Sequence, residues 1–249
     1  PAVNDLTIHV MPGESVGIVG RTGAGKSSIM VTLFRLYELT SGRIVIDGVD
    51  TSTLALQTLR QRLCVIPQEP VLFRGTLRKN LDVLGVHTDE EMIQALDDVN
   101  LKEHLLAKGA GLDMMIAEGG SNFSIGERQL ICLARGLLSR SKVIVLDEAT
   151  TNVDLQTEKR IFKALFTHCK GSTMFMIAHR LHTILSCDKI LMLEKGHVVG
   201  FGAPSELRKT CPEFAALVAK TGFDKEEGES EEQEKEKTSA AAVPPPSIL

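Results

Sequence analysis

One stretch of sequence decides the fold of this chain: Gly20-Arg21-Thr22-Gly23-Ala24-Gly25-Lys26-Ser27-Ser28. It fits the phosphate-loop pattern G-x-x-x-x-G-K-[ST]. An apolar run at 15–19 precedes it and is typical of a buried strand, and residues 27–36 have helical spacing. A glycine-rich turn between a strand and a helix points backbone N–H groups into one concavity, where a phosphate binds at the helix N-terminus. The strand and the helix disfavour the alternative, a chance glycine-rich turn.

The loop predicts a nucleotide-binding site with a bound cation. Lys26 is placed to reach the β- and γ-phosphates, and the Ser27 hydroxyl is placed to ligate Mg²⁺. We therefore predict that ATP or a related nucleotide is held by Gly20, Arg21, Thr22, Gly23, Ala24, Gly25, Lys26, Ser27 and Ser28.

Composition and length are those of a soluble globular protein with a substantial core. The chain has 249 residues, of which 43% are hydrophobic and 24% charged. No apolar run approaches the roughly 18–20 residues that span a bilayer, and the N-terminus does not resemble a signal peptide. The sequence begins at Pro1 without an initiator Met. We therefore expect it to be a piece of a longer protein.

Charge is distributed unevenly along the chain. Residues 224–249 carry eight acidic residues and three lysines, which gives this segment a net charge of −5. The formal net charge of the whole chain is −4. The remainder is thus near +1, which argues against a nucleic-acid surface. The acidic segment offers little to bury and is predicted to be disordered.

The cysteines predict a reducing environment. They are odd in number, scattered and without C-x-x-C spacing, and most lie in apolar surroundings. We expect buried thiols and neither disulfides nor a metal site at Cys64, Cys132, Cys169, Cys187 and Cys211.

Alternating strands and helices predict an α/β fold with a mainly parallel sheet, a phosphate-loop NTPase (RecA-like) core. Strands are expected at 6–10, 15–19, 43–47, 63–66, 143–146, 173–177, 189–193 and 197–201. Helices are expected at 27–36, 53–62, 88–99, 101–107, 127–139, 155–168, 205–209 and 212–219. Because no convincing strand falls within 68–140, we predict that it is an inserted helical subdomain. The ATP-binding core is then 1–67 and 141–223, followed by the tail at 224–249.

A second candidate motif is the apolar run Val143–Leu146 followed by Asp147 and Glu148. At the tip of a strand beside a phosphate loop, Asp147 would hold Mg²⁺, mostly through water. Glu148 would polarise an attacking water. Alone, such acids are often a solvated strand end. Together with the phosphate loop they indicate hydrolysis of the γ-phosphate.

The run Asn122–Leu130 (Asn-Phe-Ser-Ile-Gly-Glu-Arg-Gln-Leu) opens the predicted helix before this acidic strand. It resembles the signature motif of ATP-binding cassette (ABC) proteins, usually Leu-Ser-Gly-Gly-Gln. Ser124 and Gly126 would lie at a helix N-terminus, another anion site. The alternative is that Ser124 is only an N-cap with Glu127 as its capping-box partner.

Further ABC elements follow in the family's order. Gln68, in Ile-Pro-Gln-Glu-Pro, resembles the Q-loop glutamine, which in the family touches Mg²⁺ and the attacking water. Asp154 is similar to the D-loop aspartate, and His179 to the switch histidine that contacts the γ-phosphate. The resemblance thus implies Glu148, His179 and Gln68 as catalytic residues. It implies Ser27, Gln68 and Asp147 as Mg²⁺ ligands.

The resemblance covers residues 1–220 and is closest in detail to the C subfamily, the multidrug-resistance-associated exporters. First cassettes there commonly have Asp where Glu148 stands, so this chain resembles the second, C-terminal cassette. The signature departs from the usual form at Phe123, Ile125 and Glu127, and Glu127 would add a carboxylate near nucleotide. Residues 1–19 contain no aromatic residue to stack on adenine, and Tyr37 lies on the wrong side of the loop.

The resemblance implies an ATPase at the cytoplasmic face of a membrane, with a second cassette and transmembrane domains as partners. Organic anions or drug conjugates would be the cargo. Two alternatives stay open: a regulatory cassette that gates a channel, and a soluble ABC ATPase. A plain phosphate-loop kinase is disfavoured by the Gln68, Ser124 and His179 set. The terminal Ser247-Ile248-Leu249 has the S-x-Φ form that PDZ domains bind.

Overall fold

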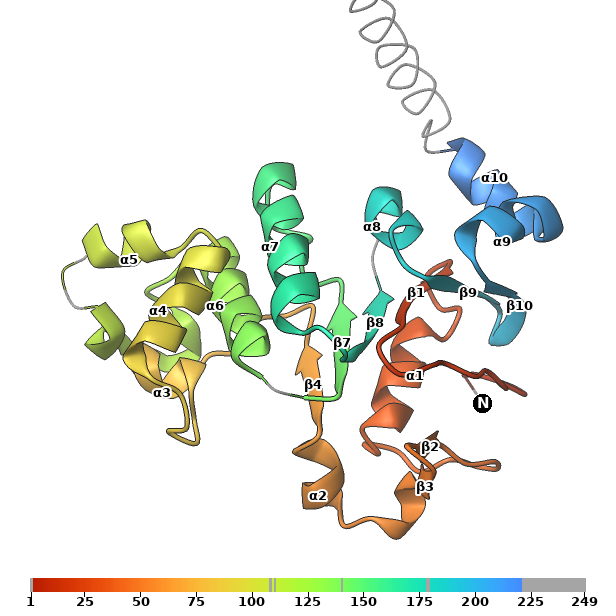
Figure 1. Ribbon diagram of the computed structural model, residues 1–249, viewed down its shortest axis with the longest axis horizontal. Coiled ribbons are helices and arrows are strands. Elements are labelled where there is room, and N and C mark those ends of the chain that lie inside the picture. Colours follow the sequence, from red (N-terminus) through yellow and green to blue (C-terminus); the bar gives the residue numbers. More distant parts are fainter. Residues whose placement is uncertain (1, 108, 110, 140, 178–179, 221–249) are drawn as a thin grey trace, which may run out of the picture.

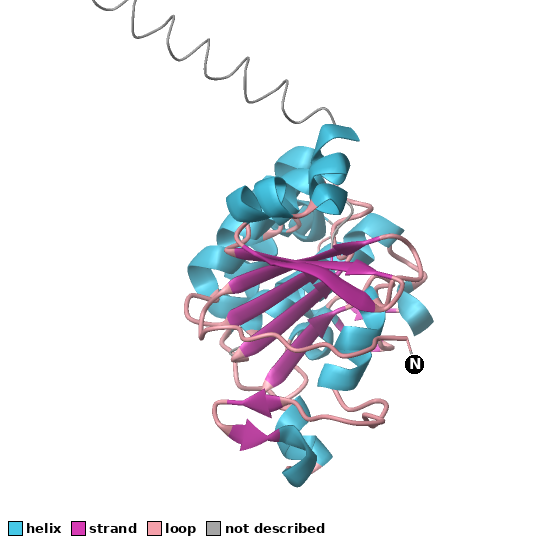
Figure 2. Cartoon of the chain, turned by 90° about the vertical axis from the view of Figure 1, so that its right-hand side faces the viewer, coloured by secondary structure: helices cyan, strands magenta, loops and turns pink. Residues whose placement is uncertain are grey.

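The computed structural model of the chain describes residues 2–107, 109, 111–139, 141–177 and 180–220. Its centre is a six-stranded sheet in the order β10-β9-β1-β8-β7-β4, seen broadside in Figure 2. The strands are β1 (Ser15–Gly20), β4 (Leu63–Ile66), β7 (Val143–Asp147), β8 (Thr173–Ile177), β9 (Lys189–Glu194) and β10 (His197–Gly202). All neighbours pair in parallel except β10, which is antiparallel to β9. The predicted α/β architecture with a mainly parallel sheet is confirmed.

Strand β7 shows why this sequence forms a central strand. All five of its residues are buried, and it pairs with β4 on one side and β8 on the other. A parallel strand covered on both faces needs apolar side chains in both directions, so it is a continuous apolar run and not an alternating one. Asp147 ends the run at the carboxyl edge of the sheet.

Helices lie around this sheet and, separately, beyond its β4 edge (Figure 1). Those around the sheet are α1 (Lys26–Leu33), α2 (Leu56–Arg60), α7 (Leu155–His168), α8 (Leu181–Leu185), α9 (Pro204–Thr210) and α10 (Pro212–Lys220). Those beyond β4 form a helical subdomain: α3 (Leu77–Leu81), α4 (Asp89–Asp98), α5 (Lys102–Ala107) and α6 (Ile125–Leu138). Short pieces complete the chain: β2 (Val45–Ile46), β3 (Val49–Asp50), β5 (Gly75–Thr76), β6 (Met115–Ile116) and the 3₁₀ turns Thr51–Thr53, Gly111–Asp113 and Glu118–Gly120.

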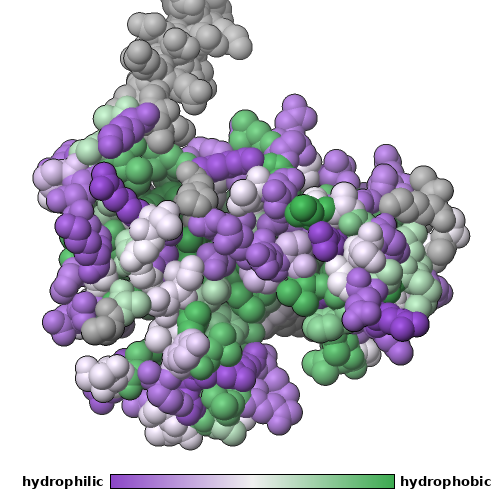
Figure 3. Space-filling model, turned by 180° about the vertical axis from the view of Figure 1, so that it is seen from behind, coloured by the Kyte–Doolittle hydropathy of each residue, from purple (hydrophilic) through white to green (hydrophobic). Residues whose placement is uncertain are grey.

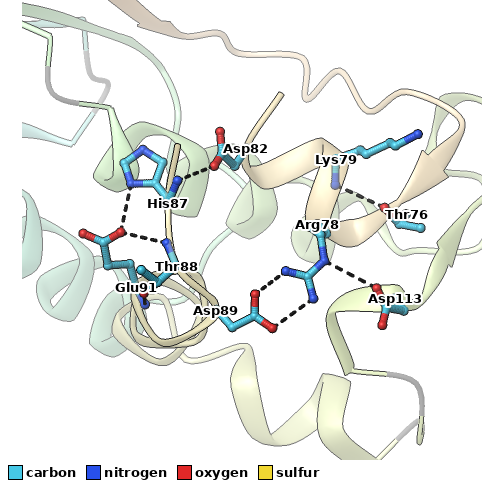
Figure 4. Close-up of polar contacts among 9 residues, drawn as sticks. All are labelled: Thr76, Arg78, Lys79, Asp82, His87, Thr88, Asp89, Glu91 and Asp113. Atoms are coloured by element: carbon cyan, nitrogen blue, oxygen red, sulfur yellow. Dashed lines mark hydrogen bonds and ion pairs between the residues drawn. The ribbon is translucent and has the colours of Figure 1, made fainter. Parts of the chain in front are cut away.

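Polar contacts fix the first half of the helical subdomain (Figure 4). Arg78 of α3 makes a two-pronged ion pair with Asp89 at the start of α4 and also reaches Asp113, 3.4 Å away. The buried carboxylate of Asp82 accepts the backbone N–H of His87 at 2.6 Å and that of Gly85 at 2.9 Å. The connection between α3 and α4 is therefore held at both ends.

One hydrophobic cluster joins the subdomain to the sheet. It contains Met92 and Leu96 of α4, Ile131 of α6, and Ile144 and Met174 of the sheet. The two regions therefore share a core and do not merely touch.

The predicted strand at 6–10 is wrong, because these residues join no sheet in the described structure. Their alternation is nevertheless visible, since Leu6, Ile8 and Val10 are half-buried against the sheet and the residues between them are exposed. Alternation reports which side chains face a core, whereas a strand also needs a hydrogen-bonded neighbour.

Other differences concern short elements. The strand expected at 43–47 is reduced to β2, and the helix expected at 53–62 is reduced to α2 with a 3₁₀ turn before it. Helices α3 and α8, which have five residues each, were not predicted. A helix of that length completes little more than one turn, so its hydrophobic periodicity is not visible in the sequence.

All five cysteines are free thiols, and four of them are buried while Cys64 is half-buried. Burial raises the pKa of Cys169 to about 11 and that of Cys187 to about 12. Buried thiols were expected, and these values make the side chains poor nucleophiles near neutral pH.

Within the described part of the chain, no helix has the length and apolar character to cross a bilayer. Figure 3 shows hydrophobic side chains on one face in separate groups among hydrophilic ones. The acidic tail and the terminal Ser247-Ile248-Leu249 lie outside the described residues.

Candidate functional site

The phosphate-loop residues connect β1 to α1, as the sequence predicts. The helix begins at Lys26, and Gly25 is its N-cap in a left-handed conformation. The Lys26 ammonium donates to the carbonyl of Gly20 at 2.8 Å and to that of Arg21 at 3.3 Å. It is thus folded back over the loop. Ser27 is exposed at the start of the helix.

Two glycines are required by close approach of the backbone. A Cβ at Gly20 would lie 2.4 Å from the Leu193 carbonyl oxygen of β9, and one at Gly25 would lie 2.6 Å from the carbonyl oxygen of Ala2. Both have positive φ, +155° and +103°. Because a side chain fits at neither place, glycine allows the loop backbone to lie close against β9 and Ala2.

The acidic pair lies at the end of β7. Asp147 is buried, and Glu148 is half-buried with φ of +50°. The Glu148 N–H donates to the Ile177 carbonyl at 2.7 Å, and its own carbonyl accepts the hydroxyl of Thr151 at 2.8 Å. A left-handed conformation at a non-glycine residue costs of order 1–3 kcal/mol and persists only where surrounding contacts impose it. Such positions cluster at functional sites.

Parallel strands bring these groups to one edge. The phosphate loop follows β1, Glu148 follows β7, and Gln68 stands two residues after β4. Only β8 separates β1 from β7, so these two strands are about 9–10 Å apart. A nucleotide phosphate chain with its cation can occupy that interval. Sites in open α/β sheets lie at this carboxyl edge.

Gln68 is exposed, and a residue that the sequence did not single out contacts its backbone. The fully buried Gln129 of α6 donates to the Gln68 carbonyl at 3.4 Å. Its side-chain oxygen accepts the amide of Asn152 at 3.2 Å. One side chain therefore joins the segment after β4 to the segment after β7.

The signature residues lie on the helical subdomain. Ser124 is the N-cap of α6, and both bonds of a capping box with Glu127 are present. This is the alternative structural role given to Ser124 from the sequence, and it is compatible with a second role toward a ligand. A Cβ on Gly126 would touch the Asn152 carbonyl at 3.5 Å, so the start of α6 contacts the segment after β7. In Figure 1, α6 and α1 lie on opposite sides of β4 and β7.

Glu127 is tied down at both oxygens. One accepts the backbone N–H of Ser124 at 2.7 Å, and the other lies 2.7 Å from the Nε2 of His104 on α5. The sequence raised the concern that the Glu127 carboxylate lies near nucleotide. In the structure, this carboxylate is bound to Ser124 and His104 of the helical subdomain.

Asp154 acts as the N-cap of α7, accepting the N–H of Thr157 at 2.9 Å and that of Gln156 at 3.1 Å. The hydrogen bonds from Thr157 are the main cause of its lowered pKa. His179 lies outside the described residues, so the structure does not place it.

Sequence reasoning also missed the ion pair of Glu158 with Arg180, in which Glu158 is fully buried and Arg180 is half-buried. Glu158 carried a signal: it has the spacing of Ile161 and Leu165 on α7, and all three are fully buried. A charged residue on the core face of a helix needs partners and is worth noticing for that reason.

The donors at this edge suit Mg²⁺. The Ser27 hydroxyl, the Gln68 side-chain carbonyl and the Asp147 carboxylate are hard oxygen ligands. No three His, Cys, Asp or Glu side chains within the described ranges group into a metal site. Mg²⁺ commonly takes one or two carboxylates, several waters and the phosphates of a substrate, so these residues fit it together with a nucleotide.

The sequence matches the family described as ABC transporter over residues 3–151. It is 45% identical to ATP-binding cassette sub-family C member 2 of Rattus norvegicus (88% of this chain, 14% of that protein). It is 49% identical to sub-family C member 10 of Mus musculus (83% and 14%) and 47% identical to metal resistance protein YCF1 of Saccharomyces cerevisiae (81% and 13%). The chain thus spans about a seventh of these relatives.

A solved structure agrees. A bacterial Atm1-family ABC exporter with ATP bound matches 89% of this chain and 39% of its own, with a TM-score of 0.84 and 32% identity. The family match includes both the phosphate loop and the acidic strand, and the fold match covers 89% of the chain. This chain therefore belongs to the ABC transporter family and is an ATPase domain similar to those of sub-family C.

Proposed function

We propose that this domain binds Mg·ATP at the carboxyl edge of its sheet and hydrolyses it to drive an exporter. Lys26 holds the β- and γ-phosphates, and the loop residues 20–28 supply N–H groups to them. Ser27, Gln68 and Asp147 hold Mg²⁺, which supplies positive charge to the phosphates when bound. Glu148 accepts a proton from the attacking water, and His179 contacts the γ-phosphate.

The observation that carries this proposal is the common edge reached by β1 and β7 with one strand between them. Lys26 at one strand end and Asp147 and Glu148 at the other flank an interval that fits a phosphate chain with its cation. The left-handed Glu148, held by the carbonyl of Ile177, fixes the carboxylate-bearing residue beside that interval.

A second cassette completes the site in this proposal. Ser124, Gly126 and Asp154 contact a nucleotide held by the partner, which is consistent with their position away from α1. The retained Glu148 favours the second, C-terminal cassette of a sub-family C exporter, with organic anions or drug conjugates as cargo. The domain boundaries at 68, 141 and 224, the cytoplasmic face of a membrane and a PDZ partner at Ser247-Ile248-Leu249 are further parts of the proposal.

A surface beside the Q-loop supports contact with transmembrane domains. Val71 and Phe73 are exposed by 51% and 60%, and Phe73 is held 6.0 Å from the Arg135 guanidinium. A hollow next to them is lined by Arg74, Met115, Ile116, Ala117, Glu118 and Asn122. We propose that an apolar segment of a transmembrane domain occupies this surface, because exposed apolar side chains around a hollow are typical of an interface.

Binding is tested with Lys26→Ala, which we expect to abolish Mg·ATP binding because the β- and γ-phosphates lose the ammonium group that holds them. Titration with a fluorescent ATP analogue measures it, and Lys209→Ala on α9 is the matched control. Unchanged affinity of Lys26→Ala would refute the assignment of the phosphate loop.

Hydrolysis is tested with Glu148→Gln in a protein that contains this chain together with the proposed partner cassette. The variant keeps the shape but not the basicity of the side chain, so we expect a trapped ATP-bound dimer and at least a hundredfold lower turnover, in line with general-base contributions. Turnover is measured by phosphate release and dimerisation by chromatography with ATP. Equal turnover in variant and parent would contradict the proposal that Glu148 accepts the proton of the attacking water.

A further inference from the structure

We infer that Glu158 is a positioning residue for the ATPase reaction: a buried carboxylate that holds the segment after β7 at a fixed distance from Arg180, the N-cap residue of α8. This inference rests on the proposed function, because the segment after β7 begins with Glu148.

Glu158 lies in the first turn of α7 and is fully buried. Its Oε1 accepts the hydroxyl of Thr150 at 2.7 Å and lies 3.4 Å from that of Thr183. Its Oε2 pairs with the Arg180 guanidinium and lies 3.4 Å from the Nε2 of His182. Both carboxylate oxygens are therefore used.

These partners come from two separate segments of the chain, one after β7 and one at the start of α8. Thr150 stands three residues after Asp147, the last residue of β7, and Arg180 stands three residues after Ile177, the last residue of β8. The second nitrogen of Arg180 donates to the Val153 carbonyl at 2.9 Å. The guanidinium of Arg180, at the start of α8, is thus bound both to the segment after β7 and to Glu158.

Strands β7 and β8 are also joined to each other directly. Asp147 is in register with Ile177, and the Glu148 N–H donates to the Ile177 carbonyl at 2.7 Å. A shift of the segment after β7 therefore moves Glu148 relative to the end of β8. A displacement of about 1 Å at a reacting group is enough to cost on the order of a hundredfold in rate.

Stability alone does not account for this carboxylate. Buried ion pairs are often no better than well-packed apolar residues, and Glu158 shares its helix face with the fully buried Ile161 and Leu165. An apolar side chain could not bind both the Thr150 hydroxyl after β7 and the Arg180 guanidinium at the start of α8. The geometry therefore points to positioning.

The test is Glu158→Gln in the full-length protein that contains this chain. We expect kcat to fall at least tenfold while the KM for ATP stays within twofold, because no hydrogen bond or ion pair in the described part of the chain joins residues 20–28 to the Glu158 cluster. Asp89→Asn is the matched control, since it removes a carboxylate from an Arg pair of the helical subdomain (Figure 4). It should leave kcat within twofold.

Two further variants cover the case in which Glu158→Gln does not fold. Thr150→Val removes a single hydroxyl, and Arg180→Lys keeps the charge but not the two-pronged reach to Glu158 and Val153. Each should lower kcat about three- to tenfold, and their combination should do less than the product of the two, because they act on one cluster. Unchanged kcat in both folded variants overturns the inference, as does an equal loss of kcat in Asp89→Asn.

Hydrogen exchange separates this inference from the proposed function. In Glu158→Gln without nucleotide, the amide protons of Glu148, Thr151 and Val153 should exchange at least tenfold faster, because the loop after β7 has lost its anchor. Unchanged exchange overturns the inference whatever the enzyme does. Faster exchange in a protein whose ATP turnover is insensitive to Lys26→Ala would support the anchor and refute the proposed function.

Discussion

Gly20 and Gly23 stand in the same loop, have positive φ, and differ in what surrounds them. A Cβ at Gly20 meets the Leu193 carbonyl oxygen at 2.4 Å, whereas one at Gly23 meets nothing within 4 Å. We expect Gly23→Ala to cost about 1–2 kcal/mol of unfolding free energy for the left-handed backbone alone. Gly20→Ala should cost clearly more, because backbone must also move. Urea unfolding of the two variants measures the difference, and equal losses would contradict the close packing of β9 on this loop.

Asp188 gives a pH dependence with a definite sign. It accepts the hydroxyl of Ser15 at 2.6 Å and the N–H of Ser15 at 2.8 Å, and these bonds lower its pKa. A carboxyl whose folded pKa is depressed contributes stability above its unfolded pKa of about 3.9, and this contribution is lost as the pH falls through the folded pKa.

We therefore expect Asp188→Asn to lower the free energy of unfolding by about 1 kcal/mol at pH 7. This value is at the low end for hydrogen bonds to a charged group, because solvent screens an exposed carboxylate. The difference from the parent should shrink below about pH 4, where the parent carboxyl also becomes neutral. Melting temperatures of both proteins from pH 7 to pH 2 measure this, with Asp5→Asn as a control. A constant difference over the range would show that the charge of Asp188 is irrelevant.

At the residue scale the sequence predicts candidate site residues but not the side chains that support them. Lys26, Asp147 and Glu148 are predicted because their motifs have fixed spacing. Gln129 and Glu158 were missed because a polar residue within a helix ordinarily faces solvent, and only the packed structure reveals that both are fully buried. The concern about Glu127 changed for the same reason, since its contact with His104 joins residues on two different helices.

Two capping boxes at the element scale allow the roles of Ser124 to be separated. Helix α4 begins with Thr88 and Glu91 and α6 with Ser124 and Glu127, and both bonds of the box are present in each. We expect Thr88→Ala and Ser124→Ala each to lower stability by about 1 kcal/mol, the usual value of an N-cap. Only Ser124→Ala should also lower ATP turnover, measured in the protein with its partner cassette. Equal turnover in the two variants would leave Ser124 as a cap alone.

Long elements were predictable, and short ones were not. The bounds expected for 63–66, 155–168 and 173–177 are those of β4, α7 and β8. These elements have a continuous apolar run or several helical turns, so their pattern repeats within the element. At 6–10 the pattern was correct and the strand was not, because pairing depends on a neighbour far away in the sequence.

At the scale of the whole molecule, the shared core predicts that the chain unfolds as one unit. The helical subdomain is an insertion in sequence, yet its buried side chains belong to the same cluster as those of β7 and β8. Separating the two regions would expose apolar surface on both, at roughly 25 cal/mol for each Å². If the helical subdomain unfolded first, it would expose this apolar surface while the rest of the chain stayed folded. Only the conformational entropy of the subdomain would then offset the cost.

Two cysteines report on this directly. Cys132 lies in α6 and Cys187 follows α8 beyond the sheet, and both are buried in that common cluster. Burial raises the pKa of each thiol, so each should react with an alkylating reagent only when its region opens. We expect pulsed alkylation across a urea series to give the same midpoint for both thiols, coincident with the loss of helical circular dichroism. Labelling of Cys132 at a lower urea concentration than Cys187 would instead show that the helical subdomain opens by itself, and the joint core would then not make the domain cooperative.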